Sequence, residues 1–173
     1  MLKDYRILPS AEILWELFEY RPLTGELVWK KQLAPRGRVG SVAGYKTATK
    51  GVEIRIKGVL YKGHRCVWKW ITGEELGNSV IDHTDRNPCN NCFWNLRIVT
   101  QMQNTWNTRS RNKFGHKGVS RNSNGTFFAR IRCGETTPLY LGAFSTPAEA
   151  AQAYSKAAAQ LHGQYACIDT MPS

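Results

Sequence analysis

Two short strand patterns and one helix start follow each other closely between residues 79 and 104, and this order constrains the fold most. Residues 79–83 read SVIDH and residues 95–99 read NLRIV, with a polar loop between them. Thr100 and Gln103 then have the spacing of a capping box, which begins a helix. The order predicts a small finger of strand, loop, strand and helix.

Four polar residues of this finger form a candidate catalytic set. Asp82 and His83 end the first strand, Asn95 opens the second, and Asn104 lies one turn into the helix. Carboxylate and amide oxygens are hard ligands, so Asp82 and Asn104 are suited to Mg²⁺ or Mn²⁺. Neighbouring strand residues point to opposite faces, so His83 can take a proton from water without binding the metal. On spacing alone, the alternative is a polar surface pair and two loop asparagines.

A basic composition points to a polyanionic partner. The 173 residues carry 24 Lys and Arg against 13 Asp and Glu, a net charge of +11, and 42% of the chain is hydrophobic. The chain can therefore bury a core and is not a disordered basic tail. Residues 1–113 hold +9 of the charge and residues 114–173 hold +2. Nucleic acid is the expected partner, ahead of an anionic membrane surface.

Membrane and disulfide signals are weak. No apolar run approaches the roughly 18 residues that a membrane span needs. Charges interrupt the amino-terminal stretch, so we expect no signal peptide and no membrane segment. The five cysteines are odd in number, which argues for free thiols in a reducing compartment.

The flanking sequence predicts an α+β protein built from short elements. Periodicity and turn residues place them at residues 10–18, 26–29, 52–61 and 64–71 before the finger, and at 126–132, 139–142 and 146–163 after it. Residues 107–116 are polar and basic, and we expect a linker there. The last third therefore predicts a small sheet with one packed helix.

Several ordered motifs resemble the HNH endonucleases, in particular the phage and homing-type branch. They are HRCVW (64–68), VIDHTDRNP (80–88), NNCFWNLRIVT (90–100) and QMQN (101–104). His83 to Asn95 is 12 residues and Asn95 to Asn104 is 9, as in that family. The resemblance covers about 100 residues, because residues 19–63 are also similar to the amino-terminal part of such proteins.

This resemblance implies a nuclease domain at residues 1–106, with a ββα-metal finger at about 79–106 behind a small β-rich amino-terminal region. His83 would be the general base, Asp82 and Asn104 would hold one divalent ion, and Asn95 would hold the loop and orient His83. Arg86 stands where the family often has Gly, so it could strain the turn or add a phosphate contact.

The carboxy-terminal motifs resemble the AP2 DNA-binding domain over about 55 residues. KGVSRNSNGTFFARIR (117–132) and YLGAFSTPAEAAQAYSKAAAQLHG (140–163) carry the resemblance. It implies a domain at 117–170 whose three-stranded sheet lies in the major groove, with one helix packed behind. Arginine can read guanine or hold phosphate. We expect DNA contacts from Arg121, from Arg130 and Arg132 on one strand face, from Arg109, Arg111 and Lys113 in the linker, and from Arg86.

These patterns predict a metal-dependent endonuclease that binds double-stranded DNA and nicks one strand per active site. The sequence does not determine the oligomeric state, and a monomer is favoured. We expect it in the cytoplasm of a bacterial or phage-infected cell. The alternative is a non-catalytic, sequence-specific DNA-binding regulator with a degenerate HNH scaffold. Cys89 and Cys92 could form half of a zinc site with His64 and Cys66, but we expect no structural zinc and a core position for Cys66. We also expect Trp68, Trp70 and Trp94 in the core.

Overall fold

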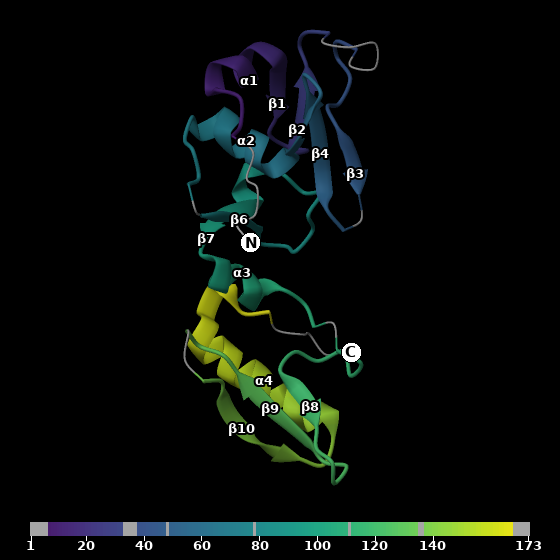
Figure 1. The fold of residues 1–173 in the computed structure, drawn as a ribbon, viewed down its shortest axis with the longest axis vertical. Coiled ribbons are helices and arrows are strands. Elements are labelled where there is room, and N and C mark those ends of the chain that lie inside the picture. The colour runs from purple at the N-terminus through teal and green to yellow at the C-terminus, as the bar shows by residue number, and fades with distance from the viewer. Residues whose placement is uncertain are drawn as a thin grey trace. The chain divides into compact units, whose positions relative to one another are not determined.

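The structure is a computed structural model that describes residues 7–32, 38–47, 49–77, 79–110, 112–134 and 137–167. The chain forms two compact units, Met1–Val99 and Thr100–Ser173. Both consist of helices and small antiparallel sheets (Figure 1), so the predicted α+β class is confirmed. Within the described ranges, no helix is both long enough and apolar enough to cross a membrane.

The described residues of the first unit form three separate antiparallel sheets and two α-helices. The sheets pair β1 with β2, β4 with both β3 and β5, and β6 with β7. In chain order the elements are α1 (Ala11–Leu17), β1 (Phe18–Arg21), β2 (Glu26–Trp29), β3 (Tyr45–Thr47), β4 (Gly51–Ile56), β5 (Val59–Lys62), α2 (Gly63–Thr72), β6 (Val80–His83) and β7 (Leu96–Val99).

Local sequence signals explain most of these boundaries. The Ser10 hydroxyl caps α1 by accepting a hydrogen bond from the Ile13 amide at 3.4 Å. Gly73 ends α2 in a left-handed conformation, as its position in the sequence predicts. Phe18 was expected on the first helix, but it is extended and opens β1, where it pairs with Trp29. Tertiary pairing therefore shortens that helix.

One apolar core joins the predicted finger to the rest of the first unit. Ile81 of β6 and Leu96 of β7 are 6% exposed each and belong to the same cluster as Phe18 and Ile54. Cys66 on α2 is fully buried in this cluster, which confirms its predicted core position. Since each fully buried apolar side chain contributes about 1.5–3 kcal/mol, the two finger strands are anchored by burial.

The second unit packs one long helix on a three-stranded sheet with strand order β10-β9-β8. Its elements are α3 (Gln101–Asn107), β8 (Val119–Arg121), β9 (Phe127–Ile131), β10 (Leu139–Phe144) and α4 (Pro147–His162). Ala150, Tyr154 and Ala158 of α4 pack against Ala129 and Ile131 of β9. The capping boxes expected at the starts of α3 and α4 are both present.

The short helix α3 is built into the second unit. The Lys117 ammonium donates to the carbonyls of Thr105, Trp106 and Thr108 at 2.6, 2.7 and 2.7 Å, and so holds the end of the helix. The Trp106 ring stacks on His162 with centroids 4.2 Å apart. The predicted nuclease domain ends at residue 106, whereas the compact units divide between Val99 and Thr100.

Candidate active site

Asp82 and His83 lie side by side at the end of β6, and both are largely buried. Asp82 is 6% exposed and His83 is 8% exposed. In the antiparallel register Asp82 lies opposite Arg97 and His83 opposite Leu96 of β7. The two side chains that the sequence singled out are therefore held by the strand pair that the core anchors.

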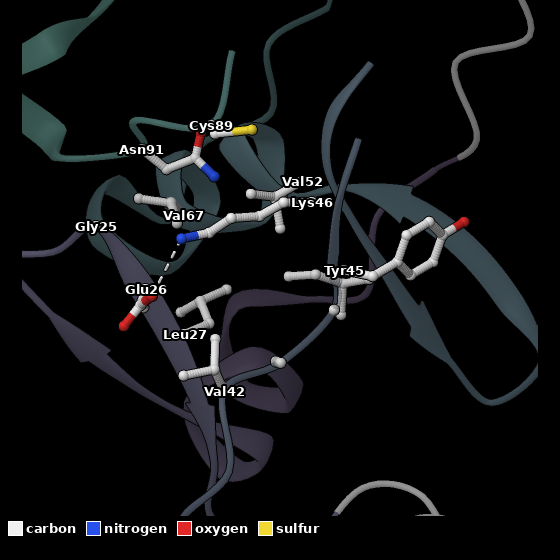
Figure 2. A pocket seen from close by; sticks show the side chains of 14 residues that line it. Gly25, Glu26, Leu27, Val42, Tyr45, Lys46, Val52, Val67, Cys89 and Asn91 are labelled. Atoms are coloured by element: carbon white, nitrogen blue, oxygen red, sulfur yellow. Dashed lines mark ion pairs between the residues drawn. The ribbon is translucent and has the colours of Figure 1, made fainter. Parts of the chain in front are cut away.

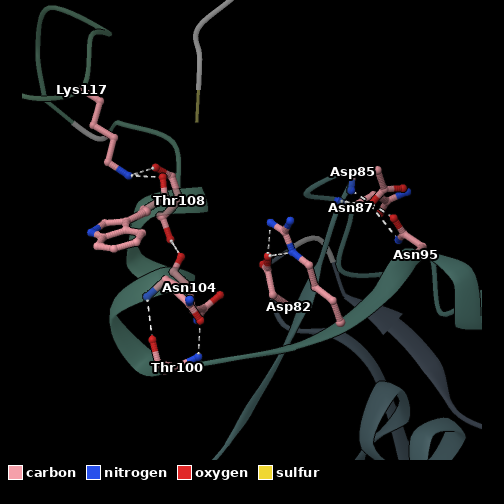
Figure 3. Close-up of polar contacts among 11 residues, drawn as sticks. Asp82, Asp85, Asn87, Asn95, Thr100, Asn104, Thr108 and Lys117 are labelled. Atoms are coloured by element: carbon pink, nitrogen blue, oxygen red, sulfur yellow. Dashed lines mark hydrogen bonds and ion pairs between the residues drawn. The ribbon is translucent and has the colours of Figure 1, made fainter. Parts of the chain in front are cut away.

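Asp82 is engaged by an arginine from the opposite strand. The Nε and Nη2 atoms of Arg97 donate to Asp82 Oδ2 at 2.9 and 2.8 Å (Figure 3). Little water reaches the pair, because the Asp82 side chain is 8% exposed and that of Arg97 is 19% exposed. A carboxylate has two oxygens and about four lone-pair directions, so its chemistry fits a hard cation as well as the guanidinium.

The His83 ring is held by one side-chain amide, that of Asn91, and by the ring of His64. Its Nε2 lies 3.0 Å from Asn91 Oδ1, and Asn91 is 2% exposed. The His64 ring meets the His83 ring edge-on, at 5.2 Å and 89°. Burial, and then the charges of His83, Arg65 and Lys62, lower the pKa of His64 to about 3, so His64 stays neutral. The sequence reasoning missed Asn91, whose signal was the asparagine doublet in NNCFWN.

Asn95 ties together the loop between β6 and β7. Its Oδ1 accepts from the Asp85 amide at 3.0 Å, and its Nδ2 donates to Asp85 Oδ1 and to the Asn90 carbonyl, at 2.9 Å each. Burial tends to raise the pKa of Asp85, but hydrogen bonds from Asn87, Asn90 and Asn95 and the charge of His83 lower it overall. Asn95 is 1% exposed and holds this loop at its centre.

Arg86 occupies the turn of that loop in a left-handed conformation. Its φ is +63°, and its amide donates to the His83 carbonyl at 2.9 Å. A left-handed backbone costs a side-chain-bearing residue roughly 1–2 kcal/mol. Of the two roles considered for Arg86, the strained turn is therefore present in the structure. The contact of Arg86 with a DNA phosphate stays a prediction.

Asn104 lies on α3, in the second unit. Its amide donates to the Thr100 carbonyl at 3.0 Å, and its carbonyl accepts from the Thr108 hydroxyl at 3.1 Å (Figure 3). Its predicted partnership with Asp82 of the first unit stays a prediction. Across the described part of the chain, no three His, Cys, Asp or Glu side chains gather into a metal-binding group. The expected ligand set contains one such side chain, Asp82, together with the amide oxygen of Asn104, and these oxygens suit Mg²⁺ or Mn²⁺.

The outer face of the second unit's sheet carries aromatic and basic side chains. Ala129 and Ile131 of β9 are buried against α4, so the alternating Phe128 and Arg130 face away. The Arg130 guanidinium lies 4.7 Å from the centre of the Phe128 ring. The centres of the Phe128 and Tyr140 rings are 6.3 Å apart, and Tyr140 is 54% exposed. Arginine stacked on aromatic rings is a common feature of nucleic-acid surfaces.

Arg132 is placed differently from Arg130, contrary to expectation. The strand β9 ends at Ile131, so the two arginines do not share a strand face. The Arg132 carbonyl accepts from His162 Nε2 at 2.9 Å, and Arg132 helps to line a cavity of about 300 Å³ together with Lys117. The chain turns away after Ile131 because α4 holds the Arg132 backbone. Among the other expected DNA contacts, Arg121, Arg109, Lys113 and Arg86 are exposed, and Arg111 lies outside the described residues.

Residues 61–106 match the family model described as HNH endonuclease. The chain is 31% identical over 105 residues to the uncharacterized HNH endonuclease L560 of Acanthamoeba polyphaga mimivirus. The aligned region covers 60% of this chain and 54% of that protein. It is 38% identical over 88 residues to the ethylene-responsive transcription factor ERF069 of Arabidopsis thaliana, covering 49% of this chain and 55% of that protein.

The chain has an HNH-like segment, which is the family match at residues 61–106, and an AP2-like segment. It is also 39% identical over 59 residues to protein 3.8 of Escherichia phage T7, covering 33% of this chain and 49% of that protein. The chain thus spans about half the length of the curated relatives it matches. No solved structure matches it.

The HNH-like segment contains Asp82, His83, Asn95 and Asn104, but it does not contain the β1–β2 hairpin. That hairpin nevertheless contacts it. The Tyr20 hydroxyl donates to the Asn91 carbonyl at 3.4 Å and accepts from the Phe93 amide at 2.9 Å. The first unit therefore surrounds the HNH-like loop with residues from outside the family match.

The cysteines and tryptophans of the HNH-like segment differ in their surroundings. The Cys89 and Cys92 thiols donate to the carbonyls of Thr47 and Leu23, at 3.8 and 3.5 Å. Trp68 and Trp70 pack against the core as expected. Trp94 is 75% exposed, so its predicted core position is wrong. The 3₁₀ turn that places Asn95 inside the loop directs Trp94 outward.

Proposed function

We propose that this protein is a metal-dependent DNA endonuclease of the HNH type, which hydrolyses a phosphodiester bond and nicks one strand per active site. The observation that carries the proposal is the buried Asp82–His83 pair on β6, within a segment that matches the HNH endonucleases. A finger of the ββα-metal type and an AP2-like sheet that lies on double-stranded DNA belong to the same proposal.

The residues divide the chemistry between base and metal. His83 takes a proton from a water molecule, and the water oxygen attacks the phosphorus. The bond between phosphorus and O3′ breaks, and O3′ takes a proton from solvent, which gives a 5′-phosphate and a 3′-hydroxyl. Asp82 and Asn104 would hold one Mg²⁺ or Mn²⁺, which would supply neutralisation of the charge that develops on the phosphate and the leaving oxygen. Asn95 holds the loop between β6 and β7 through its bonds to Asp85 and Asn90.

DNA contacts come from both units in this proposal. Arg130 offers base-edge or phosphate contacts from the outer sheet face, and Arg121 and Arg132 add contacts from other parts of the second unit. Arg109, Arg111, Lys113 and Arg86 add phosphate contacts, whose affinity depends on salt. One active site per chain favours a monomer as the acting species. The five free cysteines support a reducing, cytoplasmic setting.

A plasmid-nicking assay tests the catalytic part. Wild-type protein should convert supercoiled DNA to the open circular form with Mg²⁺ or Mn²⁺, and a chelator should stop it. His83→Ala should lower the rate at least about 100-fold, the usual contribution of a general base. His116→Ala, which removes an imidazole from the other unit, is the matched control. If supercoiled DNA stays intact with every divalent metal, the endonuclease proposal fails and the regulator alternative is favoured.

A binding titration tests the sheet. Arg130→Ala should weaken binding to a preferred duplex about 10-fold, since a good arginine–base contact contributes roughly 1–3 kcal/mol. Lys156→Ala removes the same charge from an exposed position on α4, which packs behind the sheet, and should change affinity far less. Equal losses for the two variants would mean that the outer sheet face has no special role.

A further inference from the structure

The contact between His83 and Asn91 determines which nitrogen of the His83 ring can act as a base. The side-chain amide oxygen of Asn91, Oδ1, lies 3.0 Å from His83 Nε2, and this oxygen can only accept a hydrogen bond. Nε2 must therefore carry the ring proton in the neutral imidazole. The lone pair then lies on Nδ1, which becomes the atom able to take a proton from water.

The Asn91 side chain is enclosed by its surroundings. Its nitrogen Nδ2 faces Gly63 at the start of α2, where an added Cβ would lie 3.1 Å from Nδ2 and 2.8 Å from Val52 Cβ. Asn91 is 2% exposed and lies on the wall of a cavity of about 400 Å³, with Gly25 and Val67 also on that wall (Figure 2). A buried amide with close neighbours has little freedom to rotate away from His83.

The backbone of Asn91 is held by the β1–β2 hairpin. Gly25 in the hairpin turn approaches so closely that a Cβ there would lie 2.3 Å from the Asn91 carbonyl carbon and 2.2 Å from the Cys92 amide nitrogen. The Tyr20 hydroxyl bridges the Asn91 carbonyl and the Phe93 amide, at 3.4 and 2.9 Å. Residues outside the HNH-like segment thus fix the position of Asn91.

We propose that Asn91 is a positioning residue that sets the ring tautomer of His83, and that Tyr20 and Gly25 of the amino-terminal hairpin hold Asn91 for this task. The proposal rests on the proposed function, because it assumes that His83 is the general base. It assigns the basic atom to Nδ1, and it gives the β1–β2 hairpin a part in catalysis that the family match does not cover.

Nitrogen-15 NMR of the His83 ring tests the tautomer directly. In the wild-type protein, recorded where the ring is uncharged, Nε2 should give the protonated signal and Nδ1 the unprotonated one. Asn91→Ala should mix the two tautomers, whereas Asn91→Asp keeps an acceptor oxygen and should retain the wild-type signature. A wild-type ring protonated at Nδ1, or a signature that Asn91→Ala leaves unchanged, would overturn the proposal.

Kinetics give the second readout. Asn91→Ala should lower kcat at least about 10-fold with little change in KM, because a misplaced base loses part of the usual 10²–10⁴-fold contribution. Asn91→Asp should recover most of that loss. Tyr20→Phe removes only the bridging hydroxyl, so it should fold even if Asn91→Ala does not, and it should lower kcat by a smaller factor. An unchanged kcat in Tyr20→Phe together with an unchanged tautomer would remove the hairpin from the proposal.

The two readouts separate the proposals. If the wild-type protein nicks no DNA but the His83 tautomer responds to Asn91→Ala, the endonuclease proposal fails and the control of the ring by Asn91 stands. If the protein nicks DNA and Asn91→Ala keeps the wild-type kcat, the positioning role fails and the endonuclease stands.

Discussion

Replacing Gly25 with alanine should damage the first unit at the point where the hairpin meets the HNH-like loop. Gly25 has a φ of +69°, and its added Cβ would lie 2.2 Å from the Cys92 nitrogen and 2.3 Å from the Asn91 carbonyl carbon. Both are backbone atoms, which cannot rotate aside as a flexible side chain can. Either the hairpin or the loop must therefore move.

Gly58 provides a matched control for the backbone strain alone. It has a φ of +82° in the β4–β5 turn, and among the described residues nothing lies within 4 Å of its added Cβ. Gly58→Ala should therefore cost only the left-handed strain, about 1–2 kcal/mol. Gly25→Ala should cost this strain and a further amount of about 1–3 kcal/mol, as is typical when extra atoms are forced into a packed site.

Thermal unfolding followed by circular dichroism measures the difference. For a domain of 60–100 residues, 1 kcal/mol corresponds to about 4–8 °C in Tm. Gly58→Ala should then lower the Tm of the first unit by about 4–16 °C, and Gly25→Ala should lower it by at least about 4 °C more. Equal Tm shifts in the two variants would refute the close approach of Gly25 to the loop. A Gly25→Ala protein that still folds should also show a mixed His83 tautomer.

Three other substitutions test separate contacts. Arg97→Met should lower the free energy of unfolding by about 3 kcal/mol, because it leaves the buried Asp82 carboxylate without its arginine; Mn²⁺ should restore part of the Tm if Asp82 holds the metal. Lys117→Met should cost the second unit about 1–2 kcal/mol in thermal unfolding, since three α3 carbonyls lose a charged donor. The pKa of His64 is lowered to about 3, below the unfolded value, so stability should fall as pH drops from about 6.5 towards 3. His64→Leu should flatten that part of the pH profile in denaturant titrations, and an unchanged slope would contradict the burial of its neutral ring.

Local signals in the sequence were sufficient wherever a few neighbouring residues decide the structure. Thr100 with Gln103 and Thr146 with Glu149 form capping boxes because the bonds span three residues. Alternating apolar residues placed β4, since one face of that strand is buried. The β6–β7 pair was also expected, although β6 does not show this alternation, because Ile81, Asp82 and His83 are all buried.

Contacts between distant residues could not be read from such patterns. Asn91 meets His83 across eight positions and Tyr20 across 71, and both contacts depend on the packing of a loop between two other elements. Trp94 was expected in the core because of its residue type, yet a 3₁₀ turn directs it outward. Arg132 left the face of Arg130 because β9 ends where His162 takes the backbone carbonyl.

The placement of α3 illustrates the same limit and has a consequence for how the chain can be divided. A helix as short as Gln101–Asn107 has little stability of its own, so its tertiary partners decide where it belongs. Those partners include Lys117 and His162, both carboxy-terminal to the HNH family match at 61–106. A protein cut after residue 106 would keep every residue of the HNH motif and lose the contacts that hold Asn104 on its helix. Residues 61–106 therefore contain the whole HNH sequence motif, but the helix that carries Asn104 also needs residues from the carboxy-terminal part of the chain.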